Sequence, residues 1–116
     1  MRMWMVEPEI LCRKHLLGEH VETHMFKGSI QRKKNINGFI NNNLLEPMSL
    51  LDRHEQLKQE MINRGYNHNS PLVDDYDLEY LPDSVLYYEI DKESALKDLI
   101  KRCPECNKNY IERNSI

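Results

Sequence analysis

The sequence predicts an all-α fold, and three observations support this. Apolar residues recur at helical spacing in three segments that begin near residues 13, 49 and 91. The stretches between them, 35–47 and 66–90, lack this periodicity. The first is rich in asparagine and contains a glycine and a proline, and the second contains many acidic residues. The length of 116 residues is typical of one domain. We therefore expect residues 1–116 to form a single compact domain of three main helices with long ordered loops.

The first helix is predicted over Arg13 to Phe26, with Pro8 as an early helical position and an end between Lys27 and Lys34. At about 100° per residue it carries two polar faces and one apolar face. The first polar face holds His15, Glu19, Glu22 and Phe26, the apolar face Leu17, Val21 and Met25, and the second polar face Arg13, His20 and His24. Each function considered below depends on which of these faces carries the chemistry.

The second helix is predicted to start near Ser49 and to end at Gly65, with a capping box from Ser49 to Asp52. Its buried face would hold Leu50, Leu57 and Met61, with His54 at the edge of the core.

The third helix is predicted to begin at Asp91 as N-cap, with Ile90 and Ala95 forming a hydrophobic staple. Pro104 would end it. The tyrosines of 66–90 would anchor a long ordered loop on the helices.

Composition limits the class of protein. No apolar run approaches the roughly 20 residues that span a bilayer, so we expect no membrane association. The first residues are not typical of a signal peptide, and three cysteines suggest a reducing compartment. We expect a cytoplasmic protein, in the host cytoplasm if it is viral. The net charge is −3, yet residues 1–34 carry seven Lys/Arg against four acids, which gives a basic surface.

Two pairs of residues have the spacing of metal ligands. His20 and His24 lie one helical turn apart, and Cys103-x2-Cys106 is a chelating pair. Together they could form a Cys2His2 zinc site that joins the C-terminal tail to the first helix. Alternatively, the histidines are surface residues, the cysteines are free thiols, and Cys12 is a small core residue.

Two stretches of this sequence resemble the pyrimidine-dimer DNA glycosylase family, the phage endonuclease V type. They are KHLLGEHVE at 14–22 and MINRGYN at 61–67. The resemblance covers residues 1–72 well and 90–102 loosely. It implies a compact helical protein whose N-terminal segment threads between helices. The chain departs from the family pattern at Val21, where the family carries an arginine, and in the tail 103–116, which is not aromatic.

The resemblance also implies a mechanism. The α-amine of the first residue attacks sugar C1′ of the damaged nucleotide, releases the base and forms a Schiff base, and β-elimination cuts the strand. Glu22 matches the supporting glutamate, His15 a family histidine, and Arg2 a basic residue beside the nucleophile. The chemistry is reasonable on physical grounds, because an α-amine has a pKa of about 8 and a carboxylate stabilises a positively charged sugar.

The sequence aligns with the family pattern only if Met1 occupies the position of the family's first mature residue, so the nucleophilic amine would be that of Met1. We expect Met1 to be retained, because Arg2 is a large residue. Glu19 would be structural. The residues expected to contact the DNA backbone are Arg2, Arg13, Lys14, His15, Arg32, Lys33 and Lys34.

These arguments favour a DNA repair glycosylase with AP-lyase activity, acting as a monomer on double-stranded DNA that contains a lesion or an abasic site. Met1 and Glu22 would be catalytic, and no cofactor would be required, with zinc as the alternative. The second hypothesis is a non-catalytic DNA- or protein-binding module on the same scaffold, with or without a structural zinc site. In that case the acidic stretch 72–93 would meet a basic partner.

Overall fold

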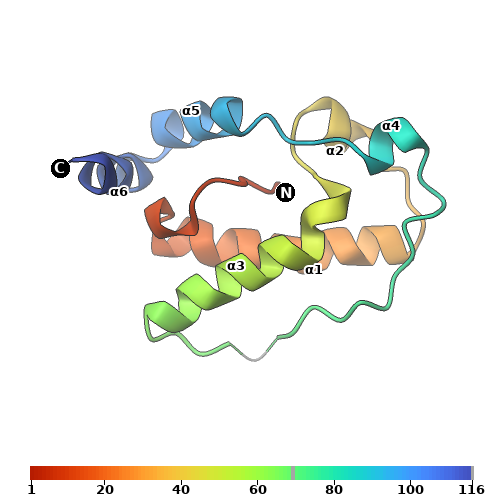
Figure 1. The fold of residues 1–116 in the computed structure, drawn as a ribbon, viewed down its shortest axis with the longest axis horizontal. Coiled ribbons are helices and arrows are strands. Elements are labelled where there is room, and N and C mark those ends of the chain that lie inside the picture. Colours follow the sequence, from red (N-terminus) through yellow and green to blue (C-terminus); the bar gives the residue numbers. More distant parts are fainter. Residues whose placement is uncertain (69, 116) are drawn as a thin grey trace.

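The computed structural model describes residues 1–68 and 70–115, and this part of the chain is helical with no β-strand (Figure 1). The predicted all-α class is therefore confirmed. The α-helices are α1 (Arg13–Gln31), α2 (Asn37–Asn41), α3 (Leu50–Asn63), α4 (Asp83–Leu86), α5 (Lys92–Arg102) and α6 (Pro104–Asn114). Two 3-10 turns, η1 (Pro8–Ile10) and η2 (Pro47–Ser49), precede α1 and α3. In the described residues no helix is both long and apolar enough to cross a bilayer.

Helices α1 and α3 pack against each other and form the base of the molecule (Figure 1). From α1 the buried side chains recur every three or four residues, as Leu16, Glu19, Thr23, Phe26 and Ile30. The residues that α3 buries include the predicted Leu50, Leu57 and Met61, and also Arg53 and His54. Burial of this regular stripe is what stabilises both helices.

The apolar face predicted on α1 does not enter the core. Val21 is 55% exposed and Met25 is 49% exposed, while Leu17 is only partly buried. The buried stripe lies instead on the side of the helix that carries Glu19 and Phe26. An apolar strip on α1 is therefore left facing solvent, immediately beside Glu22.

The N-terminal segment, residues 1–6, runs between α5 on one side and α1 with α3 on the other (Figure 1). Met3 is fully buried in one apolar cluster with Phe26 and Ala95, and Trp4 is buried in a second cluster with Leu99. The backbone N–H of Met3 donates to the carbonyl of Leu44 at 2.8 Å. The predicted threading of this segment between helices is thus confirmed.

Several predicted helix ends differ from the structure. Pro8 starts the separate turn η1, and α1 begins only at Arg13 with Cys12 as its N-cap. Ser49 does not form the predicted capping box, because its hydroxyl donates to Glu46 instead of accepting from α3. Asp91 does cap α5, accepting a hydrogen bond from the backbone N–H of Ser94 at 3.1 Å.

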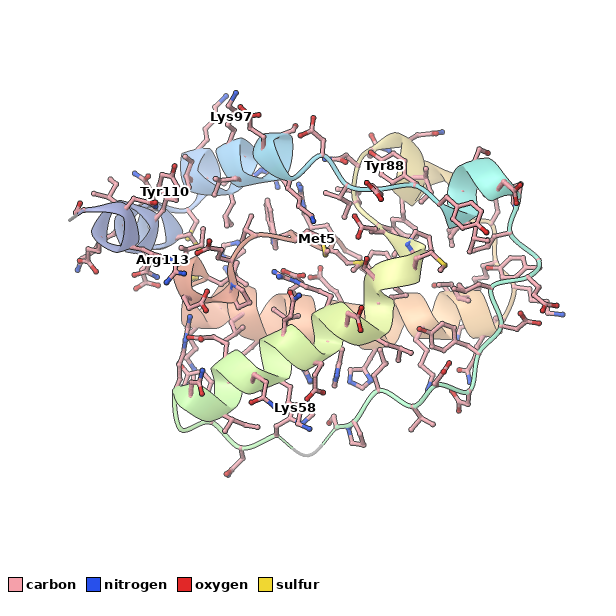
Figure 2. All side chains as sticks on the ribbon, in the orientation of Figure 1. Met5, Lys58, Tyr88, Lys97, Tyr110 and Arg113 are labelled. Atoms are coloured by element: carbon pink, nitrogen blue, oxygen red, sulfur yellow. The ribbon has the colours of Figure 1, made fainter. Side chains whose placement is uncertain are left out.

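The C-terminal tail is a helix rather than an irregular extension. Pro104 ends α5 as predicted, but it also occupies the first turn of α6, where its missing N–H is not needed. Helix α6 has 11 residues, as many as α5, so residues 1–68 and 70–115 contain four main helices where three were predicted. It packs against η1, with Arg113 paired to Glu7 and Tyr110 against the second apolar cluster (Figure 2).

The two long loops predicted at 35–47 and 66–90 contain the short helices α2 and α4. Four tyrosines of the second loop act as anchors, as predicted, and the first of them, Tyr66, packs on the second apolar cluster. Tyr80 donates to the carbonyl of Lys34 at 3.0 Å, Tyr88 donates to Asn43 at 2.6 Å, and Tyr76 packs on the first apolar cluster. Tyr87, by contrast, is 63% exposed.

Candidate active site

The α-amine of Met1 lies 3.6 Å from Oε1 of Glu22, in the middle of α1. The side chain of Met1 is 18% exposed and that of Glu22 is 26% exposed, so the pair sits at the edge of the core but remains open to solvent. The buried residues Met3 and Trp4 hold the segment in place. A chain terminus, which ordinarily moves freely, is therefore fixed next to a carboxylate.

The environment of Glu22 is electrostatically mixed. Burial raises the pKa of its carboxyl, while the amine of Met1 and the backbone amide of Arg2 oppose that rise. A carboxyl that is held near a cation but partly desolvated can accept and return a proton. As an anion it can also stabilise positive charge that develops beside it.

Arg2 is tied to its own protein. Its Nη1 donates to Oδ2 of Asp98 in α5 at 2.8 Å, and its guanidinium lies 3.7 Å from the ring centre of Trp4. Burial lowers the pKa of Arg2, and Asp98 opposes this. Nε of Arg2 is buried without a hydrogen-bond partner among the described residues. Arg2 therefore fixes the N-terminal segment against α5, and a contact with DNA would compete with Asp98.

Glu19, one turn before Glu22, has the structural role that we expected. Its carboxylate forms a two-point ion pair with Arg53 of α3, through Nε at 2.6 Å and Nη2 at 3.0 Å. The side chains of Glu19 and Arg53 are 0% and 2% exposed. Nη1 of Arg53 also donates to the carbonyl of Val6 at 2.7 Å. This buried pair joins α1, α3 and the N-terminal segment.

The predicted DNA-contacting cations fall into two separate groups. Arg13 and Lys14 lie exposed at the start of α1, where Arg13 stacks on the ring of Tyr66 at 4.6 Å. The exposed group 32–34 follows the end of α1. A helix of 19 residues is about 28 Å long, so these groups lie at opposite ends with Glu22 between them.

The structure contradicts the predicted Cys2His2 set. Its two pairs belong to different clusters, because the cysteine pair lies near the start of α1 and the histidine pair near its middle. The first cluster, called the cysteine cluster below, consists of Cys12, His15, Cys103 and Cys106. His15 is thus placed among sulfur atoms, and burial followed by the charges of Lys14 and Arg102 lowers its pKa.

The histidine cluster consists of His20, His54 and His68, with His24 beside it. Nε2 of His20 and Nε2 of His68 are 2.7 Å apart, so one donates to the other. His24 and His54 each point a ring nitrogen at the carbonyl of Ser70, at 3.0 and 3.1 Å. Burial, together with the neighbouring imidazoles, lowers the pKa of His20 to about 4.

Sequence reasoning missed Cys12, His15, His54 and His68 as members of these clusters. One signal for Cys12 was present, because Cys12-x2-His15 repeats the spacing of Cys103-x2-Cys106. Nothing in the local pattern connected His68 to His20, since the two are 48 residues apart and meet only through the packing of α1, α3 and the following loop.

Comparison with known proteins identifies the family. The family model described as pyrimidine dimer DNA glycosylase matches residues 1–74, which contain Met1, Glu22 and the buried Glu19–Arg53 pair. The chain belongs to the pyrimidine dimer DNA glycosylase family. No curated protein and no solved structure matches the chain. The family is one of DNA glycosylases, so its substrate is DNA. Helices α5 and α6 lie outside the matched residues.

Proposed function

We propose that this protein is a DNA glycosylase with AP-lyase activity that works through a Schiff base on the amine of Met1, with a pyrimidine dimer as the favoured substrate. The observation that supports this most directly is the distance of 3.6 Å between the Met1 amine and the carboxylate of Glu22. Membership of the family adds the substrate class, DNA.

The proposed reaction needs only an amine and a proton carrier. The amine of Met1 attacks C1′ of the damaged nucleotide, and the glycosidic bond breaks with its electron pair leaving on the base, which takes up a proton. Loss of a proton from nitrogen and opening of the sugar give the imine. Removal of a proton from C2′ then expels the 3′ phosphate and cuts the strand. Glu22 stabilises the positively charged sugar and carries the protons.

The surface around Glu22 is suited to approach by a nucleotide. Gly18 lies one turn before Glu22, and a Cβ added to it would meet nothing within 4 Å. Val21 and Met25 present exposed apolar side chains on the next face of α1. C1′ is hidden in a stacked duplex, so we expect the target nucleotide to be flipped out or the strand to be kinked, and apolar side chains suit contact with unstacked bases.

The remaining predicted contacts extend this surface. Lys14 at one end of α1 and Arg32, Lys33 and Lys34 at the other would bind backbone phosphates on either side of the lesion. Their separation of about 28 Å along the helix matches a footprint of roughly eight base pairs at 3.4 Å per base pair. We propose that the protein acts as a monomer.

The test is borohydride trapping on duplexes that contain an abasic site or a thymine dimer. Reduction of the imine would leave a stable adduct, and peptide mapping should place it on the amine of Met1. Acetylation of that amine should abolish the adduct without unfolding the protein. Intact mass of the purified protein checks that Met1 is retained.

Two outcomes would contradict the proposal. An adduct on Lys14 or another lysine would make the Met1 amine irrelevant to the chemistry. No adduct with either duplex, while the protein still binds DNA or a basic protein partner, would support the alternative of a non-catalytic binding module on this scaffold.

A further inference from the structure

The cysteine cluster brings together four metal-binding side chains from the starts of two helices. Cys12 is the N-cap of α1 and Cys103 is the N-cap of α6. His15 and Cys106 each lie three residues further along, in the first turn of the same helix. Two short chelating motifs from opposite ends of the chain therefore meet at one point. In the described residues all three cysteines are free thiols.

The separations of the donor atoms are close to those of a tetrahedral zinc site. Zinc bonds of about 2.3 Å to sulfur and about 2.0 Å to nitrogen require about 3.8 Å between two sulfurs and about 3.5 Å between sulfur and nitrogen. The Sγ atoms of Cys12 and Cys103 are 3.9 Å apart. Nδ1 of His15 is 3.1 Å from Sγ of Cys12 and 3.6 Å from Sγ of Cys106. All four donor atoms lie within 4.8 Å of one another.

Each sulfur also faces a backbone N–H. The N–H of His15 donates to Sγ of Cys12 at 3.5 Å, and the N–H of Cys106 donates to Sγ of Cys103 at 3.4 Å. The N–H of Cys12 donates to Sγ of Cys106 at 3.2 Å. Neutral thiols are weak acceptors, whereas thiolates are strong ones. The amino ends of two helices, of 19 and 11 residues, add positive potential at the same point.

We propose that Cys12, His15, Cys103 and Cys106 bind one zinc ion in a structural Cys3His site. Three thiolates and one imidazole in a tetrahedron are a donor set typical of zinc, and four protein ligands leave no open position for catalysis. Cys12 and Cys106 are buried, and His15 and Cys103 are partly buried, so most of the site is shielded from solvent. The site is independent of the proposed glycosylase reaction, in which no residue of the cluster other than His15 had a predicted role.

The histidine cluster is the weaker candidate for a metal. Its imidazoles already satisfy one another and the carbonyl of Ser70, at 2.7 to 3.1 Å. A contact of 2.7 Å between the Nε2 atoms of His20 and His68 is a hydrogen bond, and it is shorter than the separation of two nitrogen ligands on one zinc, about 3.3 Å.

A zinc ion at the cysteine cluster would join the C-terminal helix to the family core. Two ligands come from residues 1–74, which the family model matches, and two from beyond it. The ring of His15 lies edge-on to the ring of Trp4, with 5.7 Å between the ring centres, and the guanidinium of Arg2 stacks on the same Trp4 ring. The ion would thereby also stabilise the segment that carries Met1. His15 would act as a ligand instead of contacting DNA.

The test measures metal in the intact protein. Native mass spectrometry and elemental analysis should find one zinc per chain, and X-ray absorption should show three sulfur ligands and one nitrogen ligand. Replacement by Co²⁺ should produce the visible and sulfur-to-metal absorption bands of a tetrahedral thiolate site. Chelation should lower the melting temperature by more than about 10 °C, because metal binding contributes folding free energy.

Two variants locate the ion. Cys103→Ser, which removes a partly exposed ligand, should reduce bound zinc from one per chain to below about a tenth under dialysis. The matched control, His68→Gln in the histidine cluster, should keep one zinc per chain. The proposal is wrong if the unsubstituted protein binds no zinc and its three thiols titrate freely, or if the absorption data show only nitrogen ligands. Loss of zinc in His68→Gln but not in Cys103→Ser would assign the ion to the histidine cluster and equally overturn it.

Discussion

Two carboxylates three residues apart on α1 have opposite surroundings. Glu19 is fully buried and forms a two-point ion pair with Arg53. Glu22 is partly exposed and faces the amine of Met1 through one contact at 3.6 Å. A charge that is buried, paired and fully hydrogen-bonded is held fixed, whereas a partly exposed carboxylate beside the chain-terminal amine can take part in proton transfer. The comparison explains how neighbouring glutamates can have structural and chemical roles.

The largest expected effect comes from Glu22→Gln. Loss of the carboxylate removes both the proton carrier and the charge that stabilises the sugar cation, so single-turnover cleavage of abasic DNA should fall by about 10³-fold. The unfolding free energy should change by less than about 1 kcal/mol, because the pair is partly exposed.

Glu55→Gln on the exposed surface of α3 is a suitable control and should leave cleavage unchanged. If Glu22→Gln retained full activity while the Met1 adduct still formed, Glu22 would have no chemical role. The proposed contrast between a structural Glu19 and a chemical Glu22 would then be wrong.

The next effect is on stability. Glu19→Gln leaves the guanidinium of Arg53 buried without its counter-charge, which should lower the unfolding free energy by about 3–5 kcal/mol in urea denaturation. The double variant Glu19→Leu with Arg53→Met should be more stable than Glu19→Gln and recover most of that loss, since two apolar side chains leave no buried charge without a partner. Equal stability of Glu19→Gln and Glu22→Gln would remove the distinction between the two carboxylates.

A smaller effect concerns pH. Burial raises the pKa of Glu22 above its ordinary value of 4.5, so the folded state binds a proton more tightly than the unfolded state does. Across the window from 4.5 up to the raised pKa, the unfolding free energy should therefore fall as the pH rises. The contribution should be below about 1 kcal/mol, because solvent screens this carboxyl.

The measurement is denaturation of the parent protein and Glu22→Gln at several pH values. The difference between the two curves isolates Glu22, since all other titrating groups are shared. If the unfolding free energy of the parent protein rose relative to that of Glu22→Gln as the pH increased, the ion pair with Met1 would outweigh the burial of Glu22.

The smallest effect tests the open side of Glu22. Gly18→Ala should raise the unfolding free energy by about 0.5–1 kcal/mol, because glycine weakens a helix interior and the added methyl meets nothing within 4 Å. Gly28→Ala is the matched control in the same helix and should gain a similar amount, because its methyl would lie 3.4 Å from the flexible side chain of Arg32, which is ordinary van der Waals contact. Circular dichroism during thermal unfolding measures both. A loss of stability in Gly18→Ala would show that the surface beside Glu22 is not open.

The sequence by itself determined three of the main helices, but not α6. Periodicity and end signals located α1, α3 and α5 closely, and Asp91 capped α5 as predicted. The spacing of Glu22 from the N-terminus, with the motifs at 14–22 and 61–67, pointed to the family that the match over 1–74 confirms. These are local properties, since neighbouring residues decide whether a segment can form and end a helix.

Only the tertiary structure decided which faces and side chains meet. Helical spacing alone grouped Val21 and Met25 on an apolar face, yet both are exposed, and the buried face of the helix is the one on which Glu19 pairs with Arg53. Cys12 joins Cys106 across 94 residues, which no periodicity encodes. Helical spacing fixes the face on which a residue lies, whereas the partner of that face depends on how distant segments pack together.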